Sequence, residues 1–328
     1  MKSFTGIFAE ELNEYIQLRG KEMTAESLRS RITALYSFDQ FTIDASLKTK
    51  AVPEELVSRW IKSIEPDCAR RTVNEKISVL RCFFRYLSYL GYTVFIPNCQ
   101  KTTDSYVPYV FSDDELTQIF SAADDMRIPF RGRINTNLKY QMPVYLRILY
   151  GCGLRSGEVT NLKVKDIRFD IGVIVVRKAK NNKQRLVPMD PSLTEILQKY
   201  CIAIGNHGMP DAYLFSDKDG EQLKISAAES YFLKILKATN IYKNPLPHTR
   251  GQCIHCFRHV FAIRSFAQAE ANGRTVADSI PYLSVYLGHF DMDCTEKYLK
   301  FSSDMFPEYY KSFEDYSSKA FPEVTYEA

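Results

Sequence analysis

Residues 172–188, GVIVVRKAKNNKQRLVP, contain the one strand pair that the sequence predicts, and this pair decides the fold class. Two short valine-rich runs, 172–177 and 184–188, flank a polar segment in which Asn181 and Asn182 tolerate turn conformations. The pattern predicts a β-hairpin. Helical patterns lie on both sides of it, so the sequence predicts a mainly α fold with a small β-hairpin or sheet inside an α+β domain.

Residues 1–98 carry the patterns of about four helices. Thr24 is a typical N-cap for the helix that follows it, and Pro53 favours the first turn of another. Residues 72–90 place four large apolar side chains on one helix face, and Gly91 then ends the helix. These side chains are Ile77, Leu80, Phe84 and Leu87. A compact helical bundle is therefore expected over residues 1–98.

A polar segment separates this bundle from the rest of the chain. Residues 99–111, CQKTTDSYVPYVF, begin with polar residues and contain a proline, which favours a linker. Ser112 and Glu115 then have the spacing of a capping box that opens a new helix. We therefore expect a second domain over residues 112–303. Residues 304–328 form a tail whose large apolar side chains lie at helical spacing.

The composition is that of an ordinary globular protein. Of the 328 residues, 45% are hydrophobic and 25% are charged. There is no run of about 18 apolar residues, and the N-terminus carries acids where a signal peptide needs an apolar stretch. We therefore expect a cytoplasmic protein with no membrane partner and with its eight cysteines reduced. The net charge of +4 permits nucleic-acid binding without demonstrating it.

Two motifs with candidate DNA-contacting basic residues lie in the predicted second domain. In residues 150–158, YGCGLRSGE, an apolar helix ends at glycines and Arg155 follows at the start of the next helix. In residues 177–185, RKAKNNKQR, five of nine residues are basic and none is acidic. A surface arginine and a solvated turn are the ordinary structural alternatives. The functional interpretation is a basic ribbon against DNA phosphates, where each cation displaces counterions.

Three further motifs follow. In residues 255–259, HCFRH, His255 and Arg258 are three apart and so share one helix face. Residues 287–289 are LGH, and Tyr298 comes nine residues after His289. Taken alone, a histidine at a helix end or one tyrosine among 21 carries no functional information.

Cys253 and Cys256 overlap the HCFRH motif and suggest a zinc site. A structural zinc ion is surrounded by four ligands. His255 and His259 would complete four, but all four side chains lie within seven residues of one helix and cannot surround an ion. The sequence therefore predicts no metal.

The complete set of motifs resembles the tyrosine recombinase family, also called the phage integrase family, over essentially the whole chain. The resemblance rests on order and spacing: G-L-R-x-x-E, a K-x-x-K-x-R hairpin ending in V-P, H-x-x-R-H, L-G-H, and a tyrosine nine residues later. The catalytic residues that it implies are Arg155, Lys180, His255, Arg258, His289 and Tyr298. Lys180 lies between Ala179 and Asn181 where the family has glycines, so Lys178 and Lys183 remain alternatives.

The resemblance implies a transesterification on DNA that needs no cofactor. Tyr298 would attack phosphorus and displace a 5′ hydroxyl, leaving a 3′-phosphotyrosine bond. Arg155 and Arg258 would hold the non-bridging oxygens, because planar guanidinium forks suit them. Lys180 would protonate the leaving oxygen. His255 would act as general base or proton relay.

Supporting roles follow from the same resemblance. His289 would bond a phosphate oxygen or orient Tyr298. Glu158, three residues after Arg155, would hold that guanidinium in place. The remaining basic residues of the hairpin would contact DNA; they are Lys178, Lys183 and Arg185.

The resemblance also implies an assembly. Residues 1–98 would be a core-binding DNA-binding domain, and the two domains would form a C-shaped clamp on double-stranded DNA with inverted half-sites. A dimer would occupy each site and a tetramer the synapse, exchanging strands through a Holliday junction to integrate or excise a mobile element. The tail would pack on its own domain or dock on a neighbouring protomer.

Three alternatives remain at this point. A type IB topoisomerase shares this chemistry and would relax supercoils as a monomer. A DNA-binding protein that had lost catalysis would lack one of the motif residues, yet all are present. A zinc-dependent regulator would use Cys253 and Cys256, but the four ligands available there cannot surround an ion.

Overall fold

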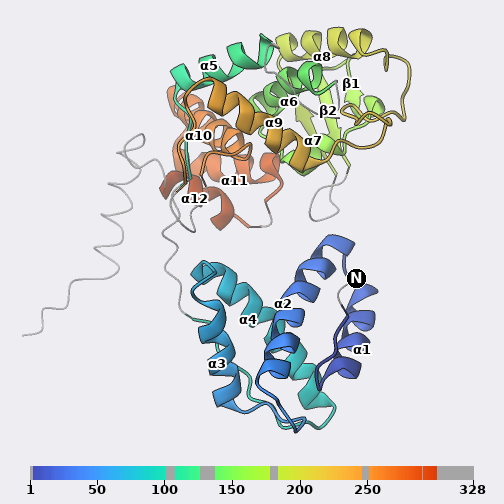
Figure 1. Ribbon diagram of the computed structural model, residues 1–328. Helices are drawn as coiled ribbons and strands as arrows, with labels where there is room; N and C mark the ends of the chain where they lie inside the picture. The colour runs from blue at the N-terminus through green and yellow to red at the C-terminus, as the bar shows by residue number, and fades with distance from the viewer. Residues whose placement is uncertain are drawn as a thin grey trace, which may run out of the picture. The chain divides into compact units, whose positions relative to one another are not determined.

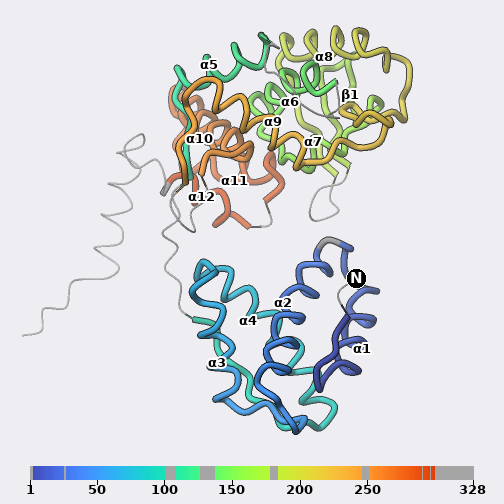
Figure 2. The backbone as a smooth tube through the Cα atoms, viewed as in Figure 1, coloured from blue at the N-terminus to red at the C-terminus, as the bar shows by residue number. Residues whose placement is uncertain are grey.

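The computed structural model describes residues 3–100, 108–125, 137–177, 184–245, 251–289 and 291–300. The chain divides into two compact units, Met1–Ser105 and Tyr106–Ala328 (Figures 1 and 2). Part of the predicted linker lies outside the described residues, as do Lys178, Lys180 and Lys183 of the hairpin and the tail at 304–328.

The N-terminal unit is a bundle of helices around an aromatic core. Its helices are α1 (Ala9–Gly20), α2 (Ala25–Asp44), α3 (Glu54–Ile64) and α4 (Arg70–Tyr89). Phe38 of α2 meets Trp60 of α3 edge to face with ring centroids 5.8 Å apart, and it meets Phe84 of α4 at 5.3 Å. All three side chains are fully buried. These aromatic contacts therefore pack α2, α3 and α4 against one another.

The helix signals predicted at Thr24, on the apolar face of α4 and at Gly91 are confirmed, whereas Pro53 is the N-cap residue before α3 and does not lie in its first turn. Thr24 Oγ1 accepts a hydrogen bond from the backbone N–H of Ser27 at 3.3 Å, as an N-cap does. The four apolar residues predicted to share one face of α4 are all buried. Gly91, with φ of +92°, has the left-handed conformation that follows a helix end.

The C-terminal unit contains most of the helices and the sheet. Its elements are α5 (Asp113–Asp124), α6 (Leu138–Cys152), α7 (Ser156–Thr160), a 3₁₀ turn (Val164–Asp166), β1 (Ile167–Arg168), β2 (Val173–Val176), β3 (Arg185–Pro188), α8 (Pro191–Ala203), α9 (Ile225–Ala238), α10 (Cys256–Ala271), α11 (Val276–Leu287) and α12 (Asp293–Lys300). The predicted capping box opens α5: Ser112 Oγ accepts from the Glu115 N–H, and the Glu115 carboxylate accepts from the Ser112 N–H.

The predicted hairpin is part of a three-stranded antiparallel sheet with strand order β1–β2–β3. Ile174 pairs with Val187, and Val176 pairs with Arg185. The sequence predicted only the pair β2–β3. It missed β1 because two residues, Ile167 and Arg168, are too few to show an alternating pattern. The mainly α fold with a small sheet is confirmed.

Helix α6 forms the centre of this unit and packs against α5, α8, α9 and α10. Its Tyr145 and Ile148 are fully buried. Phe257 of α10 lies in an aromatic cluster with Phe111 and Phe232, at centroid distances of 5.6 Å to each. Arg258 directly follows Phe257, so this packing anchors the turn of α10 that carries a predicted catalytic residue.

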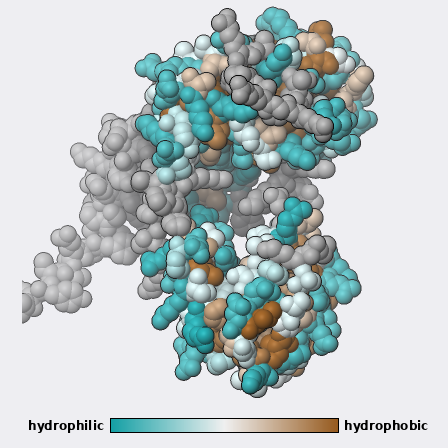
Figure 3. All heavy atoms as spheres, viewed as in Figure 1, coloured by the Kyte–Doolittle hydropathy of each residue, from teal (hydrophilic) through white to brown (hydrophobic). Residues whose placement is uncertain are grey.

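Hydrophilic side chains cover much of the face shown in Figure 3. Within the described ranges, no helix is both long and apolar enough to cross a membrane.

Candidate active site

Arg155 lies at a sharp turn between two helices. Helix α6 ends at Cys152, and Gly153 follows with φ of +60°. A Cβ atom at Gly153 would come within 2.4 Å of the Phe261 ring, so both the conformation and the space require glycine. Arg155 is then the N-cap residue of α7, with an extended backbone conformation.

Arg258 is the most deeply buried charged group of the candidate site, with 1% of its surface exposed. Its Nη1 donates to the Gly153 carbonyl and its Nη2 to the Leu287 carbonyl, both at 2.7 Å. Nη2 also lies 2.9 Å from His289 Nε2. Burial lowers the pKa of this guanidinium, and the nearby Tyr298 hydroxyl opposes that shift. Two backbone carbonyls therefore hold the planar fork in place.

The C-terminal end of α11 is the point where the two arginines meet. The Leu287 carbonyl accepts from Arg258 at 2.7 Å and from Arg155 Nη1 at 3.5 Å. The Gly288 carbonyl accepts from Arg155 Nη2 at 3.3 Å. The last carbonyls of a helix carry partial negative charge, which stabilises neighbouring cations. Gly288, with φ of +65°, ends the helix and allows this approach.

Tyr298 and His289 lie together beside Arg258. Tyr298 is on α12 and is 5% exposed. Its ring stacks on His289 with centroids 5.8 Å apart and planes at 29°. Burial, followed by the charges of Arg258 and Arg155, lowers the pKa of His289 to about 3. The structure thus brings four of the six predicted catalytic residues into one cluster: Arg155, Arg258, His289 and Tyr298.

His255 reaches this cluster through His259, which was not among the predicted catalytic residues. His255 precedes the first turn of α10 and is half-buried. Its ring centroid lies 5.0 Å from that of His259, which lies 5.3 Å from that of Tyr298. His259 was visible in the sequence as the last residue of the HCFRH motif, and that position was its only signal.

Glu158 joins two arginines that are far apart in the sequence. It is 4% exposed, and its carboxylate accepts from Arg155 Nη1 at 3.1 Å. It also receives a bidentate pair of hydrogen bonds from Arg185 Nη1 and Nη2, both at 2.9 Å. Burial raises the pKa of Glu158, but the hydrogen bonds and the charges of Arg185 and Arg155 together outweigh it, so the net shift of the pKa is downward. The predicted contact with Arg155 is present, and Arg185 is an additional partner.

Two arginines of the basic hairpin are paired with carboxylates, so their charges are less available to DNA than the sequence suggested. Arg185 was predicted to contact DNA, but its side chain is only 12% exposed and is bonded to Glu158 and to the Tyr286 carbonyl. Arg177 Nε donates to Asp166 Oδ1 at 2.5 Å. Two of the five basic residues therefore have carboxylate partners. The three lysines, including Lys180, lie outside the described residues.

The Cys253 and Cys256 sulfur atoms are 3.8 Å apart. Within the described part of the chain, no three or more histidine, cysteine, aspartate or glutamate side chains are grouped so that they could hold a metal ion.

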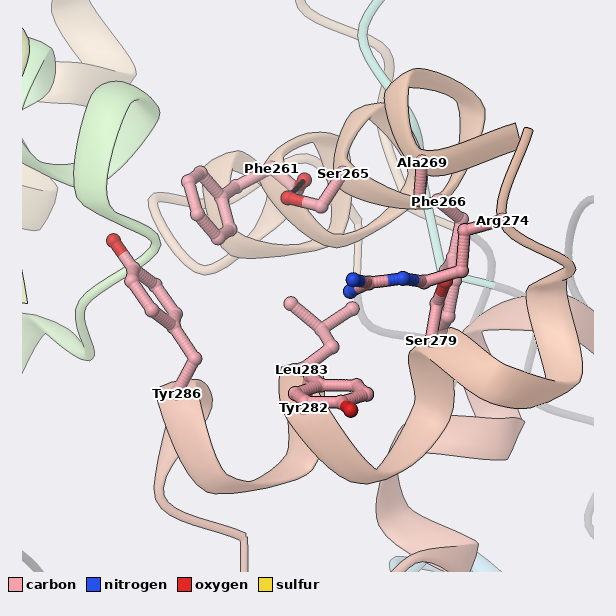
Figure 4. A pocket seen from close by; sticks show the side chains of 9 residues that line it. All are labelled: Phe261, Ser265, Phe266, Ala269, Arg274, Ser279, Tyr282, Leu283 and Tyr286. Carbon is pink, nitrogen blue, oxygen red and sulfur yellow. Dashed lines mark hydrogen bonds between the residues drawn. The ribbon is translucent and has the colours of Figure 1, made fainter. Parts of the chain in front are cut away.

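An apolar pocket of about 290 Å³ lies between α10 and α11. Phe261 and Tyr286 stack at one end, with ring planes at 15°, and Leu283 lines the middle (Figure 4). At the other end, Arg274 lies 4.7 Å above the Tyr282 ring. Leu287 and Gly288, whose carbonyls accept hydrogen bonds from Arg155 and Arg258, directly follow this stretch of α11.

The chain matches a known protein family. The model of the phage integrase family matches residues 110–304, and the chain belongs to that family. It is 29% identical over 255 residues to the tyrosine recombinase XerC of Oceanobacillus iheyensis, covering 75% of each chain. The protein is accordingly a DNA recombinase of the tyrosine recombinase type.

Solved structures share the fold. The site-specific recombinase XerH bound to its palindromic difH substrate matches with a TM-score of 0.69 and 16% identity, over 92% of this chain and 84% of that chain. A lambda integrase dimer bound to a COC′ core site matches with a TM-score of 0.66 and 15% identity, over 88% and 76% of the two chains.

Proposed function

We propose that this recombinase cleaves and rejoins DNA at specific sites through a 3′-phosphotyrosine bond to Tyr298. The observation that carries the proposal is the convergence of Arg155, Arg258, His289 and Tyr298 at the C-terminal end of α11. These residues come from the start of α7, from α10, from the turn after α11 and from α12. A purely structural cluster would not need two guanidinium groups beside a tyrosine and a neutral histidine.

The arginines suit the charge that develops during cleavage. Attack on a phosphodiester places extra negative charge on the non-bridging oxygens, and preorganised donors stabilise it most. The Gly153 and Leu287 carbonyls hold the Arg258 fork in place before DNA arrives. Arg155 is 26% exposed on its side chain and so is accessible to a ligand. Loss of one such donor typically lowers the rate about 10²–10³-fold.

The proton balance assigns the remaining roles. The Tyr298 oxygen forms a bond to phosphorus while the bond from phosphorus to the 5′ oxygen breaks. The phenolic proton of Tyr298 passes to His255 as base or relay. The line of rings from His255 through His259 to Tyr298 supports this route. Lys180 donates a proton to the leaving 5′ oxygen, with Lys178 and Lys183 as alternatives.

The reverse reaction joins the 5′ hydroxyl of a partner strand to the 3′-phosphotyrosine. Because the covalent bond conserves the phosphoester energy, neither a nucleotide nor a metal is required. Two rounds of exchange through a Holliday junction complete recombination. The substrate in this proposal is double-stranded DNA with inverted half-sites, bound through the helical unit at 1–98 and through Lys178 and Lys183. Arg185, which is bonded to Glu158, would support the site instead of contacting DNA.

The assembly that we propose is a dimer on each site and a tetramer in the synapse. Related folds were solved as a lambda integrase dimer on a core site and as a lambda integrase tetramer bound to a Holliday junction. The tail at 304–328 would dock on the neighbouring protomer by its apolar side chains, and the apolar pocket between α10 and α11 offers a surface of matching chemistry. The biological role that we propose is integration or excision of a mobile element.

Covalent capture on a nicked suicide substrate tests the nucleophile. Wild-type protein should form an adduct that survives a denaturing gel, and Tyr298→Phe should bind the same DNA without forming it, because only the hydroxyl is lost. Tyr140→Phe, on the half-exposed Tyr140 of α6, is the matched control and should form the adduct. An adduct that persists in Tyr298→Phe and disappears in Tyr282→Phe would move the assignment to α11.

Plasmid relaxation separates recombination from topoisomerase activity. We expect strand exchange between plasmids that carry the DNA flanking the gene. Relaxation of any supercoiled plasmid by a monomer, without strand exchange, would favour a type IB topoisomerase.

A further inference from the structure

The His289 ring is held on both of its nitrogen atoms. Arg258 Nη2 lies 2.9 Å from Nε2, and Thr295 Oγ1 lies 2.6 Å from Nδ1. A guanidinium can only donate hydrogen bonds. His289 Nε2 therefore accepts from Arg258 through its lone pair. A neutral imidazole carries one proton, so that proton is on Nδ1 and is donated to Thr295 Oγ1.

The neutral state of the ring has an independent cause. Burial and the neighbouring charges of Arg258 and Arg155 lower the pKa of His289 to about 3. At neutral pH the ring then has one donor and one acceptor. Arg258 requires Nε2 to be the acceptor, and Thr295 Oγ1 provides the acceptor for the proton on Nδ1.

Thr295 is fixed in place by the start of α12. It is fully buried, and its backbone N–H donates to the Met292 carbonyl at 2.7 Å. Asp291 Oδ1 accepts from the Cys294 N–H at 2.9 Å, which stabilises the same turn. Thr295 precedes Tyr298 by three residues, so both lie on one face of α12. The threonine therefore connects His289 to the helix of the proposed nucleophile.

We propose that Thr295 is a positioning residue for DNA cleavage, whose Oγ1 holds His289 in the Nδ1–H tautomer so that Nε2 orients the Arg258 guanidinium. This inference rests on the proposed function only for its consequence in catalysis. Without the Thr295 hydroxyl, the proton on Nδ1 loses its acceptor, which makes the Nδ1–H tautomer less favourable. The Nε2–H tautomer then becomes accessible, and it sets an N–H against the donors of Arg258. Loss of one such hydrogen bond corresponds to roughly a tenfold change in rate.

Two variants and a control test the proposal. Thr295→Val keeps the shape of the side chain and removes the hydroxyl, while Thr295→Ser keeps the hydroxyl. Thr239→Val is the matched control, because Thr239, the C-cap residue that follows α9, is half-buried and its hydroxyl bonds only helix carbonyls in the described contacts. We expect covalent capture to fall about tenfold in Thr295→Val and to stay near wild type in Thr295→Ser and Thr239→Val.

The tautomer is measured directly, without DNA, by ¹⁵N NMR of protein labelled at its five histidines. The His289 signal is the one that His289→Gln removes. Wild type and Thr295→Ser should show a protonated Nδ1 and an unprotonated Nε2, and Thr295→Val should lose this pattern. A protonated Nε2 in wild type overturns the proposal. So does an unchanged tautomer in Thr295→Val, whether or not capture falls, because a fall alone would then reflect packing.

Failure of the proposed function would look different. If wild type forms no covalent adduct, the nucleophile assignment fails, yet the NMR result still decides whether Thr295 sets the tautomer. If Thr295→Val does not fold, the wild-type spectrum and the Thr295→Ser pair decide the question.

Discussion

Replacement of Glu158 by glutamine should strongly destabilise the C-terminal unit. The Glu158 carboxylate receives two hydrogen bonds from Arg185 at 2.9 Å, one from the Arg155 side chain at 3.1 Å and one from the Arg155 backbone N–H at 2.9 Å. Glutamine retains one oxygen and places an NH₂ group against guanidinium donors. It also leaves Arg185, which is 12% exposed, without a countercharge in this cluster.

The magnitude follows from that burial. Removing one partner of a buried ion pair typically lowers the free energy of unfolding by about 3–5 kcal/mol. Because Arg185 retains some solvent contact, the lower end, about 3 kcal/mol, applies here. For a domain of this size, 1 kcal/mol shifts the melting temperature by about 2–4 °C. Glu158→Gln should therefore lower the melting temperature by about 6–12 °C at neutral pH.

Calorimetry or circular dichroism at pH 7 measures this shift. Glu195→Gln is the matched control, because Glu195 pairs with Lys199 on the exposed face of α8, and we expect no measurable change there. The double variant Glu158→Gln/Arg185→Gln should be less destabilised than the sum of its single variants. A melting temperature of Glu158→Gln equal to that of the control would refute the reasoning.

The pH dependence has a definite sign. The folded state lowers the pKa of Glu158, so the stabilisation is fully present above the unfolded value of about 4.3. This stabilisation is lost as the pH falls through the lower pKa that Glu158 has in the folded protein. The difference in stability between wild type and Glu158→Gln should therefore narrow in acid. A difference that grows below about pH 4 would contradict this assignment.

Three further predictions concern parts of the mechanism outside the described contacts. Lys180→Ala should strongly slow cleavage of an ordinary substrate, and a substrate with a 5′-thiol leaving group, which needs no protonation, should restore the cleavage rate. Equal slowing on both substrates would make Lys180 a phosphate contact. Restoration of the rate in Lys178→Ala or Lys183→Ala would assign the acid to that lysine. Cleavage should survive excess EDTA because arginines and a lysine supply the positive charge, so activity lost on chelation and restored by magnesium or zinc would overturn the mechanism. A chain ending at Ser303 should still bind one half-site but lose cooperative binding to a full site in a gel-shift titration, whereas unchanged cooperativity would show that the tail packs in cis or has no role in assembly.

The sequence predicted the parts of this molecule that depend on short spacings. N-caps, the capping box at Ser112 and the apolar face of α4 are set by residues three or four apart, so each was visible in the sequence. The strand pair was visible because valine runs and a polar turn are local features. Strand β1 was not, because its two residues pair only once β2 is in place.

The site was predictable as a set of residues but not as a network. The spacing of Glu158 from Arg155 suggested their contact, whereas Arg185 is 27 residues from Glu158 and was interpreted as a DNA ligand. Thr295 gave no signal at all, because one threonine near a helix start has an ordinary local explanation. These contacts depend on how α7, β3 and α11 pack in the tertiary structure.

The convergence on one helix end explains why the cluster contains a buried acid. Three guanidinium groups, those of Arg155, Arg185 and Arg258, lie near the last turn of α11 and repel one another in a low dielectric. The α11 carbonyls offset part of that repulsion. The negative charge of Glu158, which accepts hydrogen bonds from both Arg155 and Arg185, offsets a further part. Arg258 is bonded to carbonyls and to a neutral histidine instead of a carboxylate. A carboxylate on Arg258 would compete with a phosphate for the same fork, so in the proposed function this arrangement would leave its positive charge available to DNA.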